Sequence, residues 1–498
     1  MNDMTRAVLP DCSNSPEPVS PRRQFLARTS GGLGAAALAG LMQEHLTAAP
    51  TAAPAPTDGP TDGRRPGILS TTHIPARAKR VIYLFMAGGP SQIDTFDPKP
   101  KLEELNGQEL PAEVRGKQRI TLMTRKQQQL QIAASPIKFR QFGESGQVLN
   151  VHMPELAKVC DEIAIVRSLH SEPINHDPAV NMLQTGAGRA GRPCMGSWVS
   201  WGLGSENRNM PDFVVLLSGT RGQPVISRYY HSGFLPGRHQ GVQFQSQGDP
   251  VLFLSNPQGI DRRTRGRLIR GINELNRRRL EVVRDPEIEA RIDSFELAYR
   301  MQSSVPEMMD LSGEPKHIHE LYGTQPGKVS FANNCLLARR MIERGVRFVQ
   351  LYQRGWDMHG DIKNRMPKQC AEVDRPTAAL LRDLRQRGLL DETLIIWGGE
   401  FGRTTYCQGE LKATFGRDHH PRCFNAWLAG GGIRGGVTHG ATDDFGYNVI
   451  EDPVHVHDLQ ATVLHCLGID HERLVYRFQG RDQRLTDIGG QPVGELLA

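Results

Sequence analysis

The run RVIYLFMAGG at residues 80–89 decides the fold class of this 498-residue chain. Its apolar side chains follow one another almost without interruption, and the run ends in glycines. A strand with one buried face alternates apolar and polar residues, whereas a strand buried on both faces is apolar throughout. The run therefore predicts an interior strand of a parallel sheet, with a functional loop after it.

Similar apolar runs recur along the chain and are separated by helical patterns. The predicted strands lie at 162–169, 212–219, 346–353, 393–399 and 423–432, and the helical patterns lie at 329–344, 367–387 and 456–467. Strands that alternate with helices indicate an open α/β sheet, in which ligands bind beyond the carboxyl ends of the strands.

The stretch at about 258–310 departs from this alternation and predicts an insertion of two charged helices. Its many arginines allow two interpretations. One is a face that binds phosphate or nucleic acid. The other, which we favour, is a solvated helix pair whose Leu and Ile side chains turn toward the core.

Composition and charge describe an ordinary globular protein. The 60 Lys and Arg against 54 Asp and Glu give a net charge of +6, which is mild for this length and does not imply a nucleic-acid partner. Of the 8 cysteines, Cys12 falls in the N-terminal segment. The odd remainder shows neither CxxC nor zinc-finger spacing, so we expect no disulfide framework.

The N-terminus predicts export. Arg22 and Arg23 precede Phe25 and Leu26, and a weakly apolar Gly/Ala/Leu run follows. This pattern is typical of a twin-arginine (Tat) signal, here residues 1–50, and implies the Tat translocase as transport partner and a periplasmic or extracellular destination. The alternative is a basic N-terminus with a chance arginine pair.

The segment after the signal predicts a linker. Residues 51–78 begin with a Pro/Ala/Thr tract that cannot build a core. The apolar run of the signal is too short and too glycine-rich to form a stable transmembrane segment. We therefore expect one α/β domain over residues 79–498.

Polar side chains cluster where the predicted strands end. Ser91, Asp94 and Asp97 follow the first run; Asp357, His359 and Asp361 follow the run at 346–353; Glu400 and Arg403 follow the run at 393–399; and GRDHHP, with Asp418, His419 and His420, precedes the last run. In a parallel sheet these segments converge at one edge. Carboxylates together with imidazoles suit zinc, manganese or iron, whereas carboxylates alone suit magnesium or calcium.

Each of these residues also has a purely structural interpretation. Asp94 suits a helix N-cap, Asp357 to Asp361 a solvated turn, and Glu400 an ion pair with Arg403. The shared position at strand ends favours a common metal site over these separate roles.

The segment NHDPAVNMLQTG at 175–186 follows the strand at 162–169. Pro178 suits the first turn of a helix, and Asn175 or Asp177 suits its cap. The backbone amides of such a helix start would hold an anion beside His176. The alternative is simple capping, with His176 at the surface.

Several motifs together resemble one family. FMAGGPSQIDTFDPKP, NHDPAVNMLQTG, GEFGRT, GRDHHP and GGGIRGGVTHGATDDFG are similar to the Tat-exported bacterial family called domain of unknown function 1501. The resemblance runs from about residue 80 to the C-terminus. That family is similar to the alkaline phosphatase and sulfatase superfamily, which implies an alkaline-phosphatase-like α/β core with a mostly parallel central sheet flanked by helices.

The superfamily pattern implies a metal site at the strand ends. Its metal ligands would fall at Asp94, at Asp357 with His359, at Glu400, and at His419 or His420. Phe401 stands where that pattern has a histidine. We therefore expect one or two divalent ions, with His419 filling the place left by Phe401, His420 in the usual late-histidine position, and Asp418 orienting one of them. Zinc is favoured over manganese or iron.

The same resemblance suggests catalytic residues. It puts His176 where the superfamily has a Ser, Thr or Cys nucleophile, so His176 would attack, bind metal or act as a general acid. Ser91 is a second candidate nucleophile. Arg403 would hold the anion, because a guanidinium forks onto two oxygens.

Two functions follow from these features. The first is an exported metal-dependent hydrolase of phosphate or sulfate esters, acting on a small-molecule or glycan substrate. The second, motivated by the missing nucleophile and by Phe401, is a non-catalytic binding or assembly protein, with exported glycans as its candidate ligand. A nucleic-acid role for the arginine-rich helices ranks third and would require salt-sensitive binding.

Overall fold

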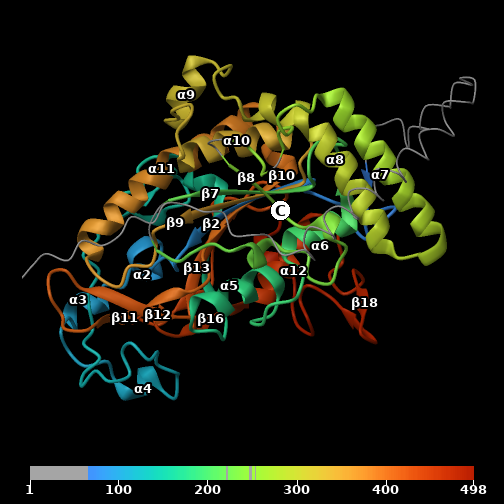
Figure 1. Ribbon diagram of the computed structural model, residues 1–498. Helices are drawn as coiled ribbons and strands as arrows, with labels where there is room; N and C mark the ends of the chain where they lie inside the picture. Colours follow the sequence, from blue (N-terminus) through green and yellow to red (C-terminus); the bar gives the residue numbers. More distant parts are fainter. Residues whose placement is uncertain (1–64, 220–221, 246–248, 253) are drawn as a thin grey trace, which may run out of the picture. The chain divides into compact units, whose positions relative to one another are not determined.

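A nine-stranded sheet forms the centre of the protein in the computed structural model, which describes residues 65–219, 222–245, 249–252 and 254–498. The strand order is β14-β5-β13-β10-β2-β9-β7-β8, and β17 also pairs with β5 (Figure 1). The strands are β2 (Arg80–Ala87), β5 (Ile163–His170), β7 (Phe213–Ser218), β8 (Val242–Phe244), β9 (Phe348–Arg354), β10 (Thr393–Gly398), β13 (Phe424–Ala429), β14 (Thr438–His439) and β17 (Val454–His455). All the apolar runs of the sequence are strands of this sheet.

The sheet is mostly parallel, as the sequence predicts. β10, β2, β9, β7 and β8 run parallel to one another, and β14 and β17 run parallel to β5. Only β13 among these strands is reversed, because it pairs antiparallel with both β10 and β5. The start of β13 therefore lies at the edge where its neighbours end.

Helices cover both faces of the sheet, which explains why β2 is apolar throughout. Val81, Tyr83 and Phe85 pack on one face with α5, α6 and α12, and the alternate side chains pack on the other face with α8, α10 and α11. Figure 1 shows these two layers above and below the strands. The helices are α5 (His176–Thr185), α6 (Met195–Leu203), α8 (Pro286–Met309), α10 (Phe331–Glu343), α11 (Ile362–Gln386) and α12 (Val456–Cys466).

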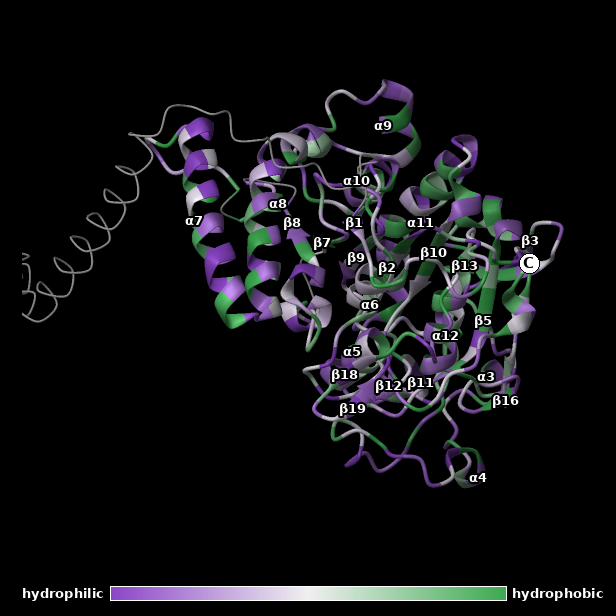
Figure 2. Ribbon diagram, turned by 90° about the vertical axis from the view of Figure 1, so that its right-hand side faces the viewer, coloured by the Kyte–Doolittle hydropathy of each residue, from purple (hydrophilic) through white to green (hydrophobic). Residues whose placement is uncertain are grey.

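Two long helices, α7 (Arg262–Val283) and α8, occupy the stretch where charged helices were expected. Asp261 and Asp285 cap them by accepting hydrogen bonds from backbone amides of the first turn. Arg277 and Glu296 form an ion pair of 3.2 Å between the two helices. Figure 2 shows α7 as largely hydrophilic, which agrees with a solvated helix. Ile269 is buried, but Leu268, Ile272 and Leu275 are exposed, so the prediction that Leu and Ile side chains turn toward the core holds only for part of this helix.

Short elements surround this core. They are α2 (Gln92–Thr95), α3 (Lys101–Glu104), α4 (Ala112–Arg115), α9 (Lys316–Tyr322), β1 (Arg65–Pro66), β3 (Phe139–Phe142), β4 (Gln147–Asn150), β6 (Gly204–Ser205), β11 (Gly402–Gln408), β12 (Gly416–His420), β15 (Ala441–Thr442), β16 (Val449–Glu451), β18 (Tyr476–Phe478) and β19 (Arg481–Gln483). Short 3-10 helices lie at Leu156–Glu162, Ser227–Tyr230, Gly237–His239, Leu390–Glu392 and Gly494–Leu496.

The structure describes only part of the N-terminal segment for which a signal and a linker are predicted. The predicted signal, residues 1–50, and the linker up to residue 64 lie outside the described residues. From Arg65 onward the predicted linker packs on the domain, because β1 pairs with β6 and the Ile68 amide donates to the Trp201 carbonyl. Composition misses this packing, since backbone hydrogen bonds hold the segment.

Two further findings concern the described part of the chain. None of its helices is both long and apolar enough to cross a membrane. Its seven cysteines are free and buried, in line with the absence of a disulfide framework expected from their spacing.

His239 is held neutral inside the fold. Its Nδ1 lies 2.7 Å from Ser200 Oγ, its Nε2 accepts a hydrogen bond from Arg238 Nε at 3.1 Å, and Ser200 in turn donates to Asp212. Burial, together with the charges of Arg238 and Arg65, lowers the pKa of His239 to about 3. A second proton on this ring would remove the acceptor that faces Arg238.

This arrangement predicts an acid-sensitive contribution to stability. Above pH 6.5 the ring is neutral in both the folded and the unfolded protein. As the pH falls toward 3, the ring takes up a proton only in the unfolded chain, so the free energy of unfolding decreases. His239→Gln should therefore flatten the fall of the free energy of unfolding between pH 6 and 4, by up to about 1.4 kcal/mol per pH unit. Urea titrations at several pH values measure this slope, and the exposed His317→Gln serves as control. Equal slopes in all three proteins would contradict the assignment.

Candidate metal site

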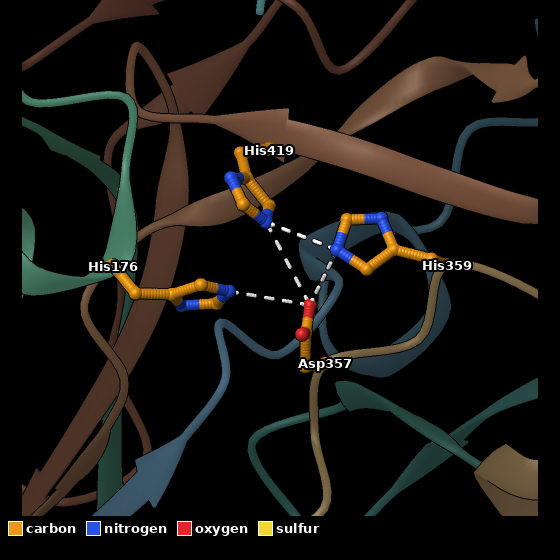
Figure 3. Close-up of side chains that lie close together, drawn as sticks. All are labelled: His176, Asp357, His359 and His419. Carbon is orange, nitrogen blue, oxygen red and sulfur yellow. Dashed lines mark hydrogen bonds and ion pairs between the residues drawn. The ribbon is translucent and has the colours of Figure 1, made fainter. Parts of the chain in front are cut away.

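Four side chains from distant parts of the sequence converge on one point (Figure 3). They are His176, Asp357, His359 and His419, and one ligand atom of each lies within 4.8 Å of the others. His176 is the first residue of α5, Asp357 and His359 follow β9, and His419 lies in β12. This is the one group of its kind among the residues that the structure describes.

The centre of this group is one oxygen of Asp357. Oδ1 lies 2.7 Å from His359 Nε2, 3.3 Å from His176 Nε2 and 3.6 Å from His419 Nε2. The Nε2 atoms of His359 and His419 are 3.2 Å apart. Three imidazoles thus present the same ring nitrogen to one carboxylate.

The other nitrogen of each imidazole faces an oxygen outside the group. His176 Nδ1 lies 2.6 Å from Glu400 Oε1, His359 Nδ1 2.5 Å from Gln408 Oε1, and His419 Nδ1 3.0 Å from the Ile174 carbonyl oxygen. A hydrogen on each Nδ1 leaves the Nε2 lone pair directed inward, which is the arrangement of histidines that bind metals.

The residues therefore fit a metal ion. His176 Nε2 is buried and lies 3.3 Å from Asp357 Oδ1 without forming a hydrogen bond of good geometry, which is costly for a polar atom unless something else satisfies it. Three imidazole nitrogens and one carboxylate oxygen form a donor set that suits zinc, iron and manganese.

The electrostatics of the group concentrate charge on Asp357. Burial raises the pKa of this carboxyl, but the contacts with His176, His359, His419 and Arg403 outweigh burial and hold it well below its ordinary value. Burial lowers the pKa of His176, yet the carboxylates of Asp357 and Glu400 raise it to about 9. Burial lowers the pKa of His419 to about 4. Asp357 is thus an anion that attracts positive charge.

Sequence comparison identifies the family. A family model described as "Protein of unknown function (DUF1501)" matches residues 78–497. The chain belongs to the DUF1501 family. This confirms the family resemblance of the sequence motifs. No curated protein matches the DUF1501 chain.

Solved structures similar to this DUF1501 chain include three bacterial enzymes. The PsFucS1 sulfatase from Pseudoalteromonas sp. shares 12% identity at a TM-score of 0.34, over 80% of this chain and 69% of that chain. The phosphonate monoester hydrolase SpPMH from Silicibacter pomeroyi shares 12% identity at 0.26, over 64% and 68%. The lipoteichoic acid synthase LtaP from Listeria monocytogenes shares 10% identity at 0.28, over 82% and 76%.

The two adjacent histidines of GRDHHP point in opposite directions in the DUF1501 chain. β12 pairs antiparallel with β11, so that His419 lies opposite Arg403 and His420 opposite Gly402. Successive side chains of a strand face opposite sides. His419 and Arg403 therefore both face Asp357, whereas His420 Nε2 lies 2.7 Å from the Tyr447 carbonyl oxygen. His420, expected as a ligand, lies outside the group of four.

Asp94 and Ser91 also lie outside this group. Asp94 forms a fully buried ion pair of 2.8 Å with Arg417 and accepts hydrogen bonds from Ser91 Oγ at 2.5 Å and Ser135 Oγ at 2.6 Å. Both carboxylate oxygens of Asp94 are thus used within the core. Ser91, expected as a second nucleophile, is buried and directed at Asp94.

Arg403 holds the site rather than facing solvent. Its Nη2 lies 2.7 Å from Asp357 Oδ1, and the guanidinium also donates to the carbonyls of Gly88, Gly89 and Arg417. Its side chain is 1% exposed. The Arg403 guanidinium, which was expected to bind two oxygens of a substrate anion, thus donates to oxygens of the protein instead.

The remaining predicted residues support the ring of histidines. Glu400 is fully buried, accepts from the Gly88 amide at 3.0 Å, and contacts His176 as described. Phe401 packs against the rings of His176 and His419, with centroid distances of 4.9 and 4.6 Å. Asp418 contacts no imidazole: it accepts from the His419 amide and from Thr121 and Thr124.

Sequence reasoning missed Gln408 and the Ile174 carbonyl. Both hold imidazoles in place, but neither belongs to a recognisable motif. Strand alternation gives no signal for Gln408, because regular alternation would put it, five residues after Arg403, on the opposite face; the pairing of β11 with β12 is irregular between Arg403 and Cys407.

The Asp94–Arg417 pair predicts a stability effect without a metal effect. Asp94→Asn leaves a buried guanidinium without its anion, which costs about 3–5 kcal/mol of unfolding free energy. Metal bound per folded molecule should stay unchanged. Urea unfolding and metal analysis of the folded fraction measure both quantities. Loss of metal at unchanged stability would instead make Asp94 a ligand.

The alternation of β12 predicts different roles for adjacent residues. His419→Gln should weaken metal binding by more than about 100-fold, since even residues that only orient metal ligands contribute 10–100-fold. His420→Gln retains an amide donor for the Tyr447 carbonyl and should leave metal affinity unchanged. Competition with a chelator of known affinity measures both variants. Equal losses would contradict the assignment.

Proposed function

We propose that this chain is an exported metal-dependent hydrolase of phosphate or sulfate esters. In this proposal one divalent ion is held by His176, Asp357, His359 and His419. The observation that carries it is the shared orientation of the three imidazoles, each with Nδ1 on an outside oxygen and Nε2 toward Asp357. The alkaline-phosphatase-like character of the fold belongs to the same proposal.

Zinc remains the favoured ion, with manganese and iron as alternatives. Four protein donors complete a tetrahedral site, so catalysis with zinc requires expansion to five ligands. Manganese and iron more readily take additional oxygen ligands. Phe401 packs against the rings of both His176 and His419, where the superfamily pattern has a histidine, which favours one ion over two.

A bound divalent cation supplies charge stabilisation at the ester oxygens. The chain itself orients the donors: Arg403 fixes Asp357, and Glu400, Gln408 and the Ile174 carbonyl fix the imidazoles. The side chains of Asp357 and His359 are 20% and 28% exposed, so an ester reaches the group from their side.

The attacking group in this proposal is water. In the described chain, the hydrogen bonds and ion pairs of these four side chains involve no Ser, Thr or Cys side chain. His176 Nδ1 lies 2.6 Å from Glu400 Oε1, and its Nε2 is directed at Asp357 among the proposed metal ligands, so in this proposal His176 binds the ion and does not form a covalent intermediate.

A non-catalytic binding or assembly protein is the second candidate, with exported glycans as its candidate ligand. The buried position of Ser91 and the occupied guanidinium of Arg403 favour it, because both remove groups that a phosphatase or sulfatase would use. In either case we propose export through the Tat translocase by residues 1–50, to the periplasm or beyond.

Metal analysis and turnover test the proposal. Protein exported through its own signal should contain one divalent ion and hydrolyse aryl phosphates or sulfates. Asp357→Asn should lose the ion and lower kcat/KM by at least about 10²-fold, the scale of one lost electrostatic stabiliser. The exposed Lys412→Gln is the control. The absence of both bound metal and turnover would overturn the proposal. Bound metal without turnover would favour the binding protein.

A further inference from the structure

A basic cavity adjoins the candidate metal site. It has a volume of about 620 Å³ and is lined by residues 115–123 and Arg125 of one segment, together with Ile174 and Asn175. The segment follows α4, which Figures 1 and 2 show at the outer side of the β11–β12 ribbon. This volume is in the range of small-molecule binding sites.

The cavity carries uncompensated positive charge. Arg115, Lys117, Arg119 and Arg125 line it, and no acidic residue does. None of the four forms an ion pair with a carboxylate of the described residues. Lys117, Arg119 and Arg125 are exposed. Elsewhere in the fold, basic side chains commonly pair with Asp or Glu, so four unpaired cations in one concavity indicate an anionic ligand.

Two contacts tie this cavity to the metal site. Thr121 and Thr124 donate hydrogen bonds to Asp418, which directly precedes His419 in β12. Ile174 lines the cavity, and its carbonyl oxygen holds His419 Nδ1. A molecule bound in the cavity therefore lies beside the residues that position the metal ligands.

We propose that this cavity is a subsite for an additional anionic group of the substrate. The inference rests on the proposed hydrolase function: an ester at the metal site would carry at least one further sulfate or phosphate group, held by Arg119 and Arg125. Guanidinium groups suit these anions because they donate two parallel hydrogen bonds. Preferred substrates are thus esters with several sulfate or phosphate groups.

The lining argues against nucleic acid as the ligand. Single-stranded nucleic acids bind through aromatic side chains that stack on the bases. No aromatic residue lines the cavity, whereas Leu122 and Met123 do. A compact multi-anionic ester fits this composition better than a nucleotide chain.

Binding measured with the full chain tests the subsite. The probes are a heparin-derived hexasaccharide for sulfate, inorganic tripolyphosphate for phosphate, and a thymidine oligonucleotide. Arg119→Gln/Arg125→Gln should weaken binding of a sulfated or phosphorylated probe by at least about tenfold, the scale of one lost charge-assisted hydrogen bond. The matched control is Arg263→Gln/Arg270→Gln on α7, which removes two exposed arginines of similar charge.

The outcomes distinguish sulfate from phosphate as the bound anion, and they distinguish failure of the subsite from failure of the hydrolase function. Loss with only the hexasaccharide or only tripolyphosphate supports the subsite and identifies sulfate or phosphate. Equal loss in the control pair, no loss, or tighter binding of the oligonucleotide overturns it. Titrating the probes in the presence of EDTA removes divalent ions, so that probe binding at the cavity is measured without a metal in the candidate metal site. If the Arg119→Gln/Arg125→Gln variant selectively loses probe binding but the protein shows no turnover, the subsite is supported and the hydrolase function is overturned. If the protein shows turnover and this variant keeps its probe binding and KM, the subsite alone is overturned.

Discussion

The reversal of β13 within the sheet determines where the site forms. Parallel strands end at one edge, so Asp357 and His359 after β9 and Glu400 after β10 emerge there together. Because β13 runs in the opposite direction, the residues that precede it reach the same edge. The β11–β12 ribbon, which bridges β10 and β13, therefore carries His419 to the side chains that follow the other strands.

Buried charges hold this edge in one conformation. Arg403 connects Asp357 to the carbonyls of Gly88 and Gly89 after β2, and Arg417 pairs with Asp94 in α2, the short helix that follows. Both arginines lie on the ribbon, on β11 and β12. Removing one partner of such a buried pair leaves an uncompensated charge. The ribbon is thus locked to the sheet edge, which preorganises the imidazoles.

Much of the fold could be predicted from the sequence. Continuous apolar runs identified the strands of the central sheet, because strands buried on both faces admit few polar residues. Boundaries were less accurate: α11 begins at Ile362 rather than at 367, and Pro367 lies inside it. The packing of residues 65–78 was missed, since it depends on backbone hydrogen bonds to distant segments, which composition does not encode.

The candidate site was predicted in outline, as a cluster of carboxylates and imidazoles at the strand ends. Asp357, His359 and His419 were expected as ligands, and the structure brings them together with His176, which the sequence suggested mainly as a nucleophile. It leaves Asp94, Glu400 and His420 outside the group. The reason is the orientation of the side chains: a motif gives the position of a residue in the sequence, but not the direction in which its side chain points.

The sequence by itself determined the α/β class, the family and the edge at which functional residues gather, because these follow from apolar patterning and motifs. Only the tertiary structure decided which residues meet. The register of β11 with β12 turns His419 inward and His420 away, and the Arg417 charge captures Asp94. Register and ion pairing depend on contacts between segments hundreds of residues apart, and local sequence does not specify them.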